Sequence, residues 1–202
     1  MGFLEHLYAL LIGYALGSVP FGLLLALAAG KGDIRNIGSG NIGATNVLRT
    51  GSKGLAAGTL LLDMGKGLAA VVIADRLMGP STLAYGPASL AALGAVLGHC
   101  FPVWLRFKGG KGVATNAGVA FGLAWPIGLA YALVWLVVLA AGRVSSLAGM
   151  SAVIAAAIAA GVLGYGHFVP VLAVIAVLVV FLHRSNIRRL VDGTEPRVGR
   201  KS

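Results

Sequence analysis

Residues 7–29 read LYALLIGYALGSVPFGLLLALAA, a continuous apolar run without a charged side chain. A helix needs about 20 such residues to cross the hydrocarbon core of a bilayer, so this run predicts a membrane-spanning helix. Pro20 lies inside the run, and we expect it to kink the helix because proline lacks the backbone N–H of the helical ladder. The chain is therefore predicted to be anchored in a membrane from this segment onward.

The whole chain has the composition of a membrane protein. Of its 202 residues, 58% are hydrophobic and 11% are charged, and the mean hydropathy is +0.91. A soluble globule of this size needs more polar surface than this sequence provides. No segment between the apolar runs is long enough to bury a separate soluble core. Residues 1–202 are therefore predicted to form one all-α, membrane-embedded domain.

The other apolar runs predict six further helices. Two of the runs are simple spans, at residues 55–78 and 83–105. Residues 113–141 are interrupted at Trp125 and Pro126, and residues 147–182 at the Gly-Tyr-Gly-His stretch 164–167, so each is expected to form a pair of helices. The result is a seven-transmembrane-helix bundle. A five-span alternative would keep the last two stretches as single, overlong helices.

Basic residues set the expected orientation, because lysine and arginine in short loops mark the cytoplasmic side. They gather in four segments, at residues 30–54, residues 106–112, Arg143 and the tail from residue 184. Seven spans place all four segments on one side, with Arg76 at the outer edge and Lys66 inside the second span. The N-terminus is therefore predicted outside and the C-terminus in the cytoplasm.

The glycine spacing predicts close helix packing, and the net charge predicts attraction to lipid headgroups. Among the 31 glycines, four pairs have the GxxxG spacing that lets membrane helices approach closely, at Gly13/Gly17, Gly54/Gly58, Gly94/Gly98 and Gly118/Gly122. The net charge of +10 is explained by attraction to anionic lipid headgroups. No basic stripe interleaved with aromatic residues lies on a soluble domain, so nucleic-acid binding is not indicated.

The first predicted cytoplasmic loop has the profile of an anion-binding site. Residues 36–49 read NIGSGNIGATNVLR, with three glycines, two hydroxyls, three amides and one arginine. Glycine lets backbone N–H groups turn toward one point, hydroxyls and amides add donors, and arginine makes a two-pronged contact with phosphate. The alternative is a flexible polar linker. Residues 38–43 match GxGxxG, but no βαβ unit surrounds them, which excludes a Rossmann interpretation.

Two more segments on the same predicted face have related chemistry. Residues 99–115 read HCFPVWLRFKGGKGVAT, in which two lysines bracket a glycine pair before a helix. This spacing lacks the Walker pattern, yet a helix N-terminus attracts an anion; a basic cap on a span is the alternative. Residues 183–195 read HRSNIRRLVDGTE, in which His183 and Asn186 would share one face of a helical turn. A solvated helix end is the alternative there.

A pair of charges is expected inside the second span. Asp63 and Lys66 lie three residues apart, and an unpaired charge is costly within a membrane. We therefore expect these two side chains to pair, either as a structural feature or beside the site.

Taken together, these segments resemble the bacterial acyl-phosphate:glycerol-3-phosphate acyltransferase family, PlsY. The resemblance rests on Gly38 to Arg49, Asp63 to Gly67, Gly98 to Thr115 and His183 to Glu195, in that order along nearly the whole chain. It implies seven spans with the active site at the cytoplasmic face of the bacterial inner membrane. It also implies transfer of an acyl group from acyl phosphate to glycerol 3-phosphate, which makes lysophosphatidic acid in the first step of phospholipid synthesis.

The resemblance also implies the site residues. Three are assigned catalytic roles, namely Ser39, Lys111 and His183. The substrate-binding set comprises Gly38, Gly40, Asn41, Thr45, Asn46, Arg49, Lys108, Gly109, Gly110, Ser145 and Asn186. Ser146 is an alternative to Ser145 because it offers the same hydroxyl one residue later. No metal, cofactor or protein partner is expected, and membrane lipids surround the bundle.

The expected chemistry needs no covalent enzyme nucleophile, because an acyl phosphate is already an activated mixed anhydride. Arg49 and Lys111 would hold the two phosphates, while Ser39 and the glycine-rich backbone would donate to the oxygen that gains charge. The His-x4-Asp pair of other glycerolipid acyltransferases is absent from the sequence. His183 can accept the proton, but a phosphate oxygen of a bound substrate is the preferred acceptor.

Carboxylates are few near the basic cluster, and three of them are expected to be peripheral: Asp33, Asp192 and Glu195. Two rival classes remain. A transporter or channel for a phosphorylated solute would show matched halves and polar residues across the span. A lipid-binding scaffold would not need amides, hydroxyls and lysines at fixed places in three loops.

Overall fold

The computed structural model describes residues 3–199, and every regular element in that range is a helix. The α-helices are α1 (Phe3–Gly17), α2 (Phe21–Ala28), α3 (Ala44–Val47), α4 (Lys53–Met78), α5 (Pro87–Cys100), α6 (Val113–Leu123), α7 (Trp125–Gly142), α8 (Ser145–Val162), α9 (Val169–Leu182) and α10 (Arg184–Val191). Short 3₁₀ turns are η1 (Ile34–Asn36), η2 (Leu48–Thr50), η3 (Val103–Leu105) and η4 (Gly166–Phe168).

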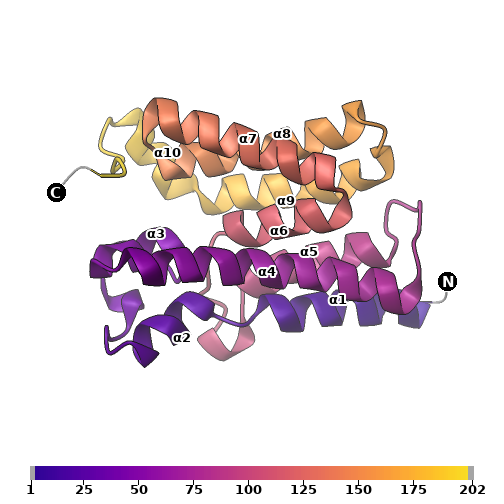
Figure 1. The fold of residues 1–202 in the computed structure, drawn as a ribbon, viewed down its shortest axis with the longest axis horizontal. Helices are drawn as coiled ribbons and strands as arrows, with labels where there is room; N and C mark the ends of the chain where they lie inside the picture. The colour runs from indigo at the N-terminus through magenta and orange to yellow at the C-terminus, as the bar shows by residue number, and fades with distance from the viewer. Residues whose placement is uncertain (1–2, 200–202) are drawn as a thin grey trace.

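The long helices run along a common direction in two groups (Figure 1). One group contains α1, α2, α4 and α5, and the other contains α7, α8 and α9. The short helix α6 lies between them and contacts α4 and α5 as well as α7 and α8. The largest cluster of buried apolar residues draws on both groups, which are joined by α6 and by a direct contact between α5 and α9.

The breaks expected in the apolar runs are present. α1 ends at Gly17 and α2 begins at Phe21, directly after Pro20. α6 and α7 are separate helices that meet at Ala124, while α8 and α9 are separated by η4 and pack against each other. Neither long stretch is one continuous helix, so the two overlong helices of the five-span alternative do not form.

An all-α integral membrane fold is confirmed, whereas the count of seven spans stays a prediction. By length and composition, five helical segments are suited to crossing a membrane, or six if α9 and α10 form one span bent by 59°. α6 has 11 residues, and at about 1.5 Å per residue it is too short for a hydrocarbon core of about 30 Å.

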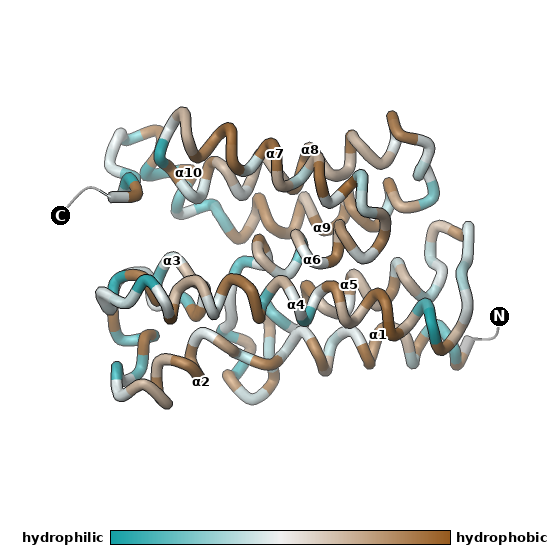
Figure 2. Tube along the Cα trace, viewed as in Figure 1, coloured by the Kyte–Doolittle hydropathy of each residue, from teal (hydrophilic) through white to brown (hydrophobic). Residues whose placement is uncertain are grey.

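Polar and basic segments collect at one end of the bundle. Figure 2 shows hydrophilic residues concentrated around α3 and α10, while the middles of the long helices are mostly hydrophobic. The described N-terminal end of α1 lies at the opposite end of the bundle from α3 and the C-terminal segment (Figure 1). The loops that carry the three polar motifs are therefore neighbours in space, as the expected topology requires.

Three of the four glycine pairs lie at helix contacts. A Cβ on Gly13 or Gly17 would overlap the backbone of α5, and a Cβ on Gly94 or Gly98 would overlap the backbone of α1. Gly118 and Gly122 on α6 pack in the same way against α4, at Met64 and Val71. The pair Gly54 and Gly58 does not form such a contact: a Cβ on Gly54 would meet open space, and one on Gly58 would be in ordinary contact with Leu25.

Replacing Gly94 with leucine is expected to destabilise the bundle, because the new side chain would be forced into the backbone of α1 at Leu10 and Tyr14. Overpacking of this kind costs about 1–3 kcal/mol. The thermal unfolding midpoint of detergent-purified Gly94→Leu should therefore fall below that of the wild type. Gly54→Ala is the matched control and should leave it unchanged or slightly raised; equal midpoints for all three proteins would contradict the packing argument.

Candidate active site

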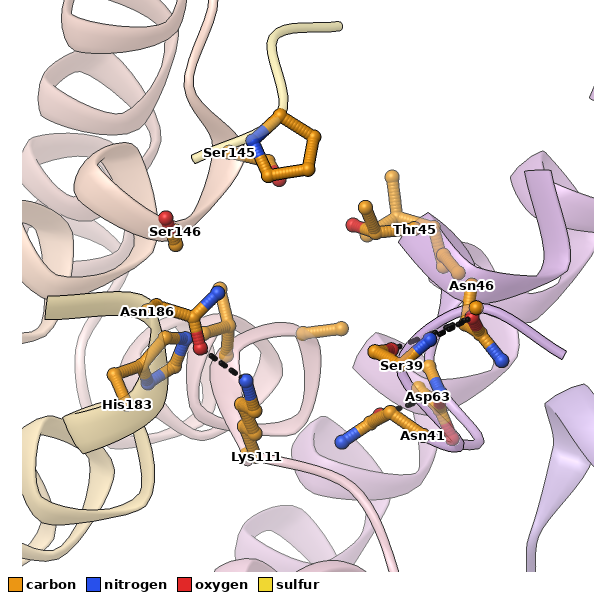
Figure 3. Close-up of a pocket in the computed structure, with 18 of the residues that line it drawn as sticks. Ser39, Asn41, Thr45, Asn46, Asp63, Lys111, Ser145, Ser146, His183 and Asn186 are labelled. Atoms are coloured by element: carbon orange, nitrogen blue, oxygen red, sulfur yellow. Dashed lines mark hydrogen bonds between the residues drawn. The ribbon is translucent and has the colours of Figure 1, made fainter. Parts of the chain in front are cut away.

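A pocket with a volume of about 380 Å³ lies between the two helix groups, at the end of the bundle that carries α3 and α10. Figure 3 shows two walls and Lys111 between them: one wall holds Ser39, Asn41, Thr45, Asn46 and Asp63, and the other holds Ser145, Ser146, His183 and Asn186. Gly38, Arg49, Arg189 and Glu195 also line the pocket. Segments far apart in the sequence thus form a single cavity.

The first wall is shaped by the amide of Asn46, which is buried. Its Nδ2 donates to the carbonyl of Ile34 at 2.7 Å, and its Oδ1 accepts from the backbone N–H of Ser39 at 3.1 Å and from the Ser39 hydroxyl at 3.3 Å. Gly38 has a positive φ of 55°, and a Cβ there would collide with Asn46 and with the Arg49 side chain. The loop therefore needs glycine at this position to bring Ser39 and Arg49 to the same cavity.

The second wall depends on a hydrogen-bond network that starts at Lys111. The Lys111 ammonium donates to Oδ1 of Asn186, and Nδ2 of Asn186 donates to the Glu195 carboxylate at 2.6 Å. The same carboxylate accepts from the Ser146 hydroxyl at 2.6 Å and from Nε of Arg189 at 2.7 Å. Glu195 thereby connects the tail after α10 with α8 and with the loop before α6.

His183 lies at the bend between α9 and α10 and is buried. Its Nδ1 is 2.7 Å from the carbonyl of Val179. A carbonyl can only accept, so Nδ1 carries the hydrogen and Nε2 keeps the lone pair when the ring is neutral. His183 is therefore held in a tautomer that can take up a proton at Nε2.

Burial and neighbouring charges shift two ionisations in the pocket. Burial lowers the pKa of the Lys111 ammonium below its usual value, and the positive charge of Arg189 adds to this effect. Burial alone would raise the pKa of Glu195, but hydrogen bonds from Ser146, Asn186 and Arg189 outweigh it and hold that pKa below its usual value. The pocket thus keeps Glu195 as an anion among cations.

Four of the expected site residues do not line the pocket. Lys108 is exposed outside it, and Gly40 is an exposed turn residue with φ of 67°. Gly109 and Gly110 pack on the end of α5, where their N–H groups donate to the carbonyls of Cys100 at 3.1 Å and His99 at 2.9 Å. Lys111 directly follows this turn, so the hydrogen bonds of the two glycines to the end of α5 fix the backbone from which the lysine side chain extends.

The described residues offer no ready metal site, since no group of three or more His, Cys, Asp and Glu side chains in residues 3–199 is arranged to hold a metal ion. The chemistry that the pocket can perform follows from its cations, amides and hydroxyls, from the imidazoles of His99 and His183, and from the carboxylates of Asp63 and Glu195. Such a set binds phosphate oxygens and stabilises negative charge that develops on a reacting group.

Comparison with known proteins decides the family. The model of the family described as glycerol-3-phosphate acyltransferase matches residues 7–193. The chain belongs to this family. It is 65% identical over 198 residues to the glycerol-3-phosphate acyltransferase of Erythrobacter litoralis (strain HTCC2594), with 98% of each chain covered. It is 54% identical over 200 residues to that of Nitrobacter winogradskyi, covering 99% of this chain and 100% of the relative.

Solved structures agree with this assignment. The glycerol 3-phosphate form of PlsY (YgiH), an integral membrane glycerol 3-phosphate acyltransferase, is 40% identical with a TM-score of 0.88, and 96% of each chain is covered. Its lysophosphatidic acid form is 39% identical with a TM-score of 0.86, covering 96% of this chain and 95% of the other. The protein is an integral membrane glycerol-3-phosphate acyltransferase of the PlsY family, as its motifs predicted.

One expectation about this acyltransferase was wrong. Glu195 is not peripheral: it lines the pocket, and its side chain is 7% exposed. The other two carboxylates do lie outside the pocket, with Asp33 paired to Arg35 at 2.6 Å and Asp192 exposed on the tail. The sequence feature that could have indicated this position is the Gly-Thr-Glu ending of the third motif. The chain reverses direction there and brings Glu195 back to α10.

Two neighbouring serines on the second wall of the pocket have different contacts. Both Ser145 and Ser146 line the cavity, and Ser146 is the one that bonds to Glu195. Asp63, His99 and Arg189 also line the pocket and were not among the expected site residues. Arg189 is one of several tail arginines, and nothing in the sequence distinguishes it from its neighbours.

Glu195→Gln is expected to lower kcat/KM by about tenfold or more, because hydrogen bonds that involve a charged group contribute about 1.5–3 kcal/mol and three donors meet this carboxylate. The effect should be measured as acyl transfer to glycerol 3-phosphate by purified protein. Asp192→Asn removes an exposed carboxylate outside the pocket and should be neutral. Wild-type rates for Glu195→Gln would show that the network does not support the site.

The activity should fall on the alkaline side at a pH below that typical of a lysine. Lys111 binds anions only when protonated, and its lowered pKa means that the proton is lost earlier as pH rises. A profile of kcat/KM against pH should show this limb, and Lys111→Arg should move it upward because a guanidinium stays charged. An alkaline limb that is identical in the two proteins would rule out Lys111 as its origin.

Proposed function

We propose that this acyltransferase moves a fatty acyl group from acyl phosphate to the C1 hydroxyl of glycerol 3-phosphate, releasing lysophosphatidic acid and inorganic phosphate. The observation that carries the proposal is a single pocket with two cationic side chains, Arg49 and Lys111, besides Arg189, which is paired with Glu195. Within residues 3–199 neither Arg49 nor Lys111 forms an ion pair with a carboxylate. Both are available to phosphate groups, which matches two phosphorylated substrates.

The side chains that line the pocket suit direct transfer of the acyl group from one substrate to the other. The C1 oxygen of glycerol 3-phosphate attacks the acyl carbonyl carbon, a new ester C–O bond forms, and the bond from that carbon to the phosphate oxygen breaks. Arg49 and Lys111 hold the phosphates, and Lys111 is fixed by Asn186 in the orientation required. The Ser39 hydroxyl, which donates to Asn46 in the structure and would turn to the substrate, is the proposed donor for the carbonyl oxygen as it gains charge.

The hydroxyl proton goes to a phosphate oxygen of a bound substrate. The only carboxylates that line the pocket in the described chain, Asp63 and Glu195, already accept from cationic or polar donors. His183 has a free Nε2 and is the second possible acceptor. Inorganic phosphate leaves with the charge that the cations of the pocket stabilise.

The acyl chain is assigned to the apolar part of the same cavity. Leu60 of α4 and Trp135 of α7 line the pocket, and both side chains are partly exposed. An acyl chain between them would reach the surrounding lipid while its reactive end stays with the cations. We also propose that the pocket faces the cytoplasm from the bacterial inner membrane, with seven spans, because the basic segments gather at that end.

The test uses purified protein in detergent with palmitoyl phosphate and glycerol 3-phosphate, with lysophosphatidic acid and inorganic phosphate as the measured products. Both products should form in equal amounts, and palmitoyl coenzyme A should not replace the acyl phosphate. Transfer from the coenzyme A ester alone would overturn the assignment of the donor.

Two variants test the roles within the pocket. Lys111→Ala should lower kcat/KM by about a hundredfold or more, the usual cost of removing a group that stabilises transition-state charge. His183→Ala should retain more activity, because a substrate phosphate oxygen takes the proton. The reverse order of activities in the acyl-transfer assay would make His183 the proton acceptor and overturn the substrate-assisted mechanism.

A further inference from the structure

Three ionisable side chains lie together at the wall of the pocket that α4 and α5 form. They are Asp63 and Lys66 on α4 and His99 on α5, and they form what we call the Asp63 cluster. All are buried, with exposures of 2% for Asp63, 6% for Lys66 and 3% for His99. Burying ionisable side chains inside a membrane protein costs free energy, so such residues usually mark a functional site.

The cluster has an internal order centred on the carboxylate. Oδ1 of Asp63 is 2.7 Å from Nζ of Lys66 and 3.6 Å from Nδ1 of His99. Lys66 also donates to the carbonyl of Val19 at 2.7 Å, in the break between α1 and α2. The carboxylate therefore connects α4, the end of α5 and the broken first helix.

His99 in turn supports the turn that precedes Lys111. Its carbonyl accepts from the N–H of Gly110 at 2.9 Å, and the Cys100 carbonyl accepts from the N–H of Gly109 at 3.1 Å. The imidazole lies so close to Gly110 that a Cβ on that glycine would overlap Nε2. Nothing larger than glycine fits there while His99 keeps its place, and Lys111 is the next residue.

Stability alone does not explain such a cluster, because buried ion pairs are often no more stabilising than apolar residues of the same volume. The position of the cluster suggests its role. Asp63 and His99 both line the pocket, and His99 touches the turn that aims Lys111 at Asn186. We propose that Asp63, Lys66 and His99 act as positioning residues, which fix the Gly109-Gly110 turn and thereby hold Lys111 where it binds phosphate.

This inference rests on the proposed role of Lys111, so its test starts from binding rather than from acyl transfer. The probe is glycerol 3-phosphate, titrated by calorimetry into the full-length protein in detergent, with Lys111→Ala as the reference for a lost phosphate contact. His99→Ala and Gly110→Ala should each weaken binding by about tenfold. Because both act through one contact, the double variant should stay near tenfold instead of the hundredfold that independent sites would give.

Two further variants separate positioning from general stability. Ser89→Ala removes another buried polar side chain of α5, which is 1% exposed and lies outside the pocket, and it should bind glycerol 3-phosphate as the wild type does. His99→Gln keeps a side-chain N–H that can donate to Asp63 and should retain most of the affinity. If His99→Ala does not fold, Gly110→Ala is compared in wild-type and His99→Gln proteins, and its cost should be smaller beside the flexible glutamine.

Four outcomes would overturn all or part of the proposal. One is wild-type affinity and kcat/KM for folded His99→Ala with only a lowered unfolding midpoint, which would make the cluster a structural support. Another is full additivity of His99→Ala and Gly110→Ala. A third is unchanged binding in Lys111→Ala, which would remove the proposed phosphate contact as well. Weakened binding in Lys111→Ala with normal binding in both His99 variants would overturn the positioning role alone.

Discussion

The hydrogen bond from Lys111 to Asn186 joins the loop before α6 to α10, and much of the site depends on it. Lysine and arginine repel one another, so gathering Lys111, Arg184 and Arg189 in one region is unfavourable without a counter-charge. Glu195, in the tail after α10, provides that negative charge. The side-chain amide of Asn186 lies between the two groups: it donates to Glu195 and accepts from Lys111. The carboxylate pairs with Arg189, while Lys111 forms no ion pair within residues 3–199 and keeps its charge available to a ligand.

The break in the first helix serves the same organisation from the other group of helices. Pro20 stops the helical ladder, and this leaves carbonyls at Ser18 and Val19 for partners outside α1. The Ser18 carbonyl accepts from Nε1 of Trp104 at 2.8 Å, and the Val19 carbonyl accepts from Lys66. Both donors belong to segments that lead toward the pocket. A residue that first indicates only a kink therefore creates two acceptors that hold functional loops.

The sequence predicted what local pattern and hydrophobicity determine. The helical class, the breaks near Pro20 and Trp125, the pairing of Asp63 with Lys66 and the convergence of three motifs all follow from short-range spacing. Lys108 was expected in the site beside Lys111 but does not line the pocket, because the backbone turn aims the two lysines of one loop in different directions. The sequence also misjudged Glu195, whose position depends on how the tail folds back. Long-range placement of this kind is set by packing.

The shortness of α6 has a consequence for how the enzyme experiences its membrane. A helix of 11 residues is shorter than the hydrocarbon core of a typical bilayer, so its height is set by its protein neighbours. Gly118 fits against Met64, Gly149 of α8 packs on Val113, and the Tyr131 hydroxyl donates to the Val113 carbonyl at 2.7 Å. Longer helices respond to changes in bilayer thickness by tilting, whereas α6 follows its protein contacts. Lys111, just before α6, thus keeps its depth relative to the rest of the site when lipid composition alters the surrounding thickness.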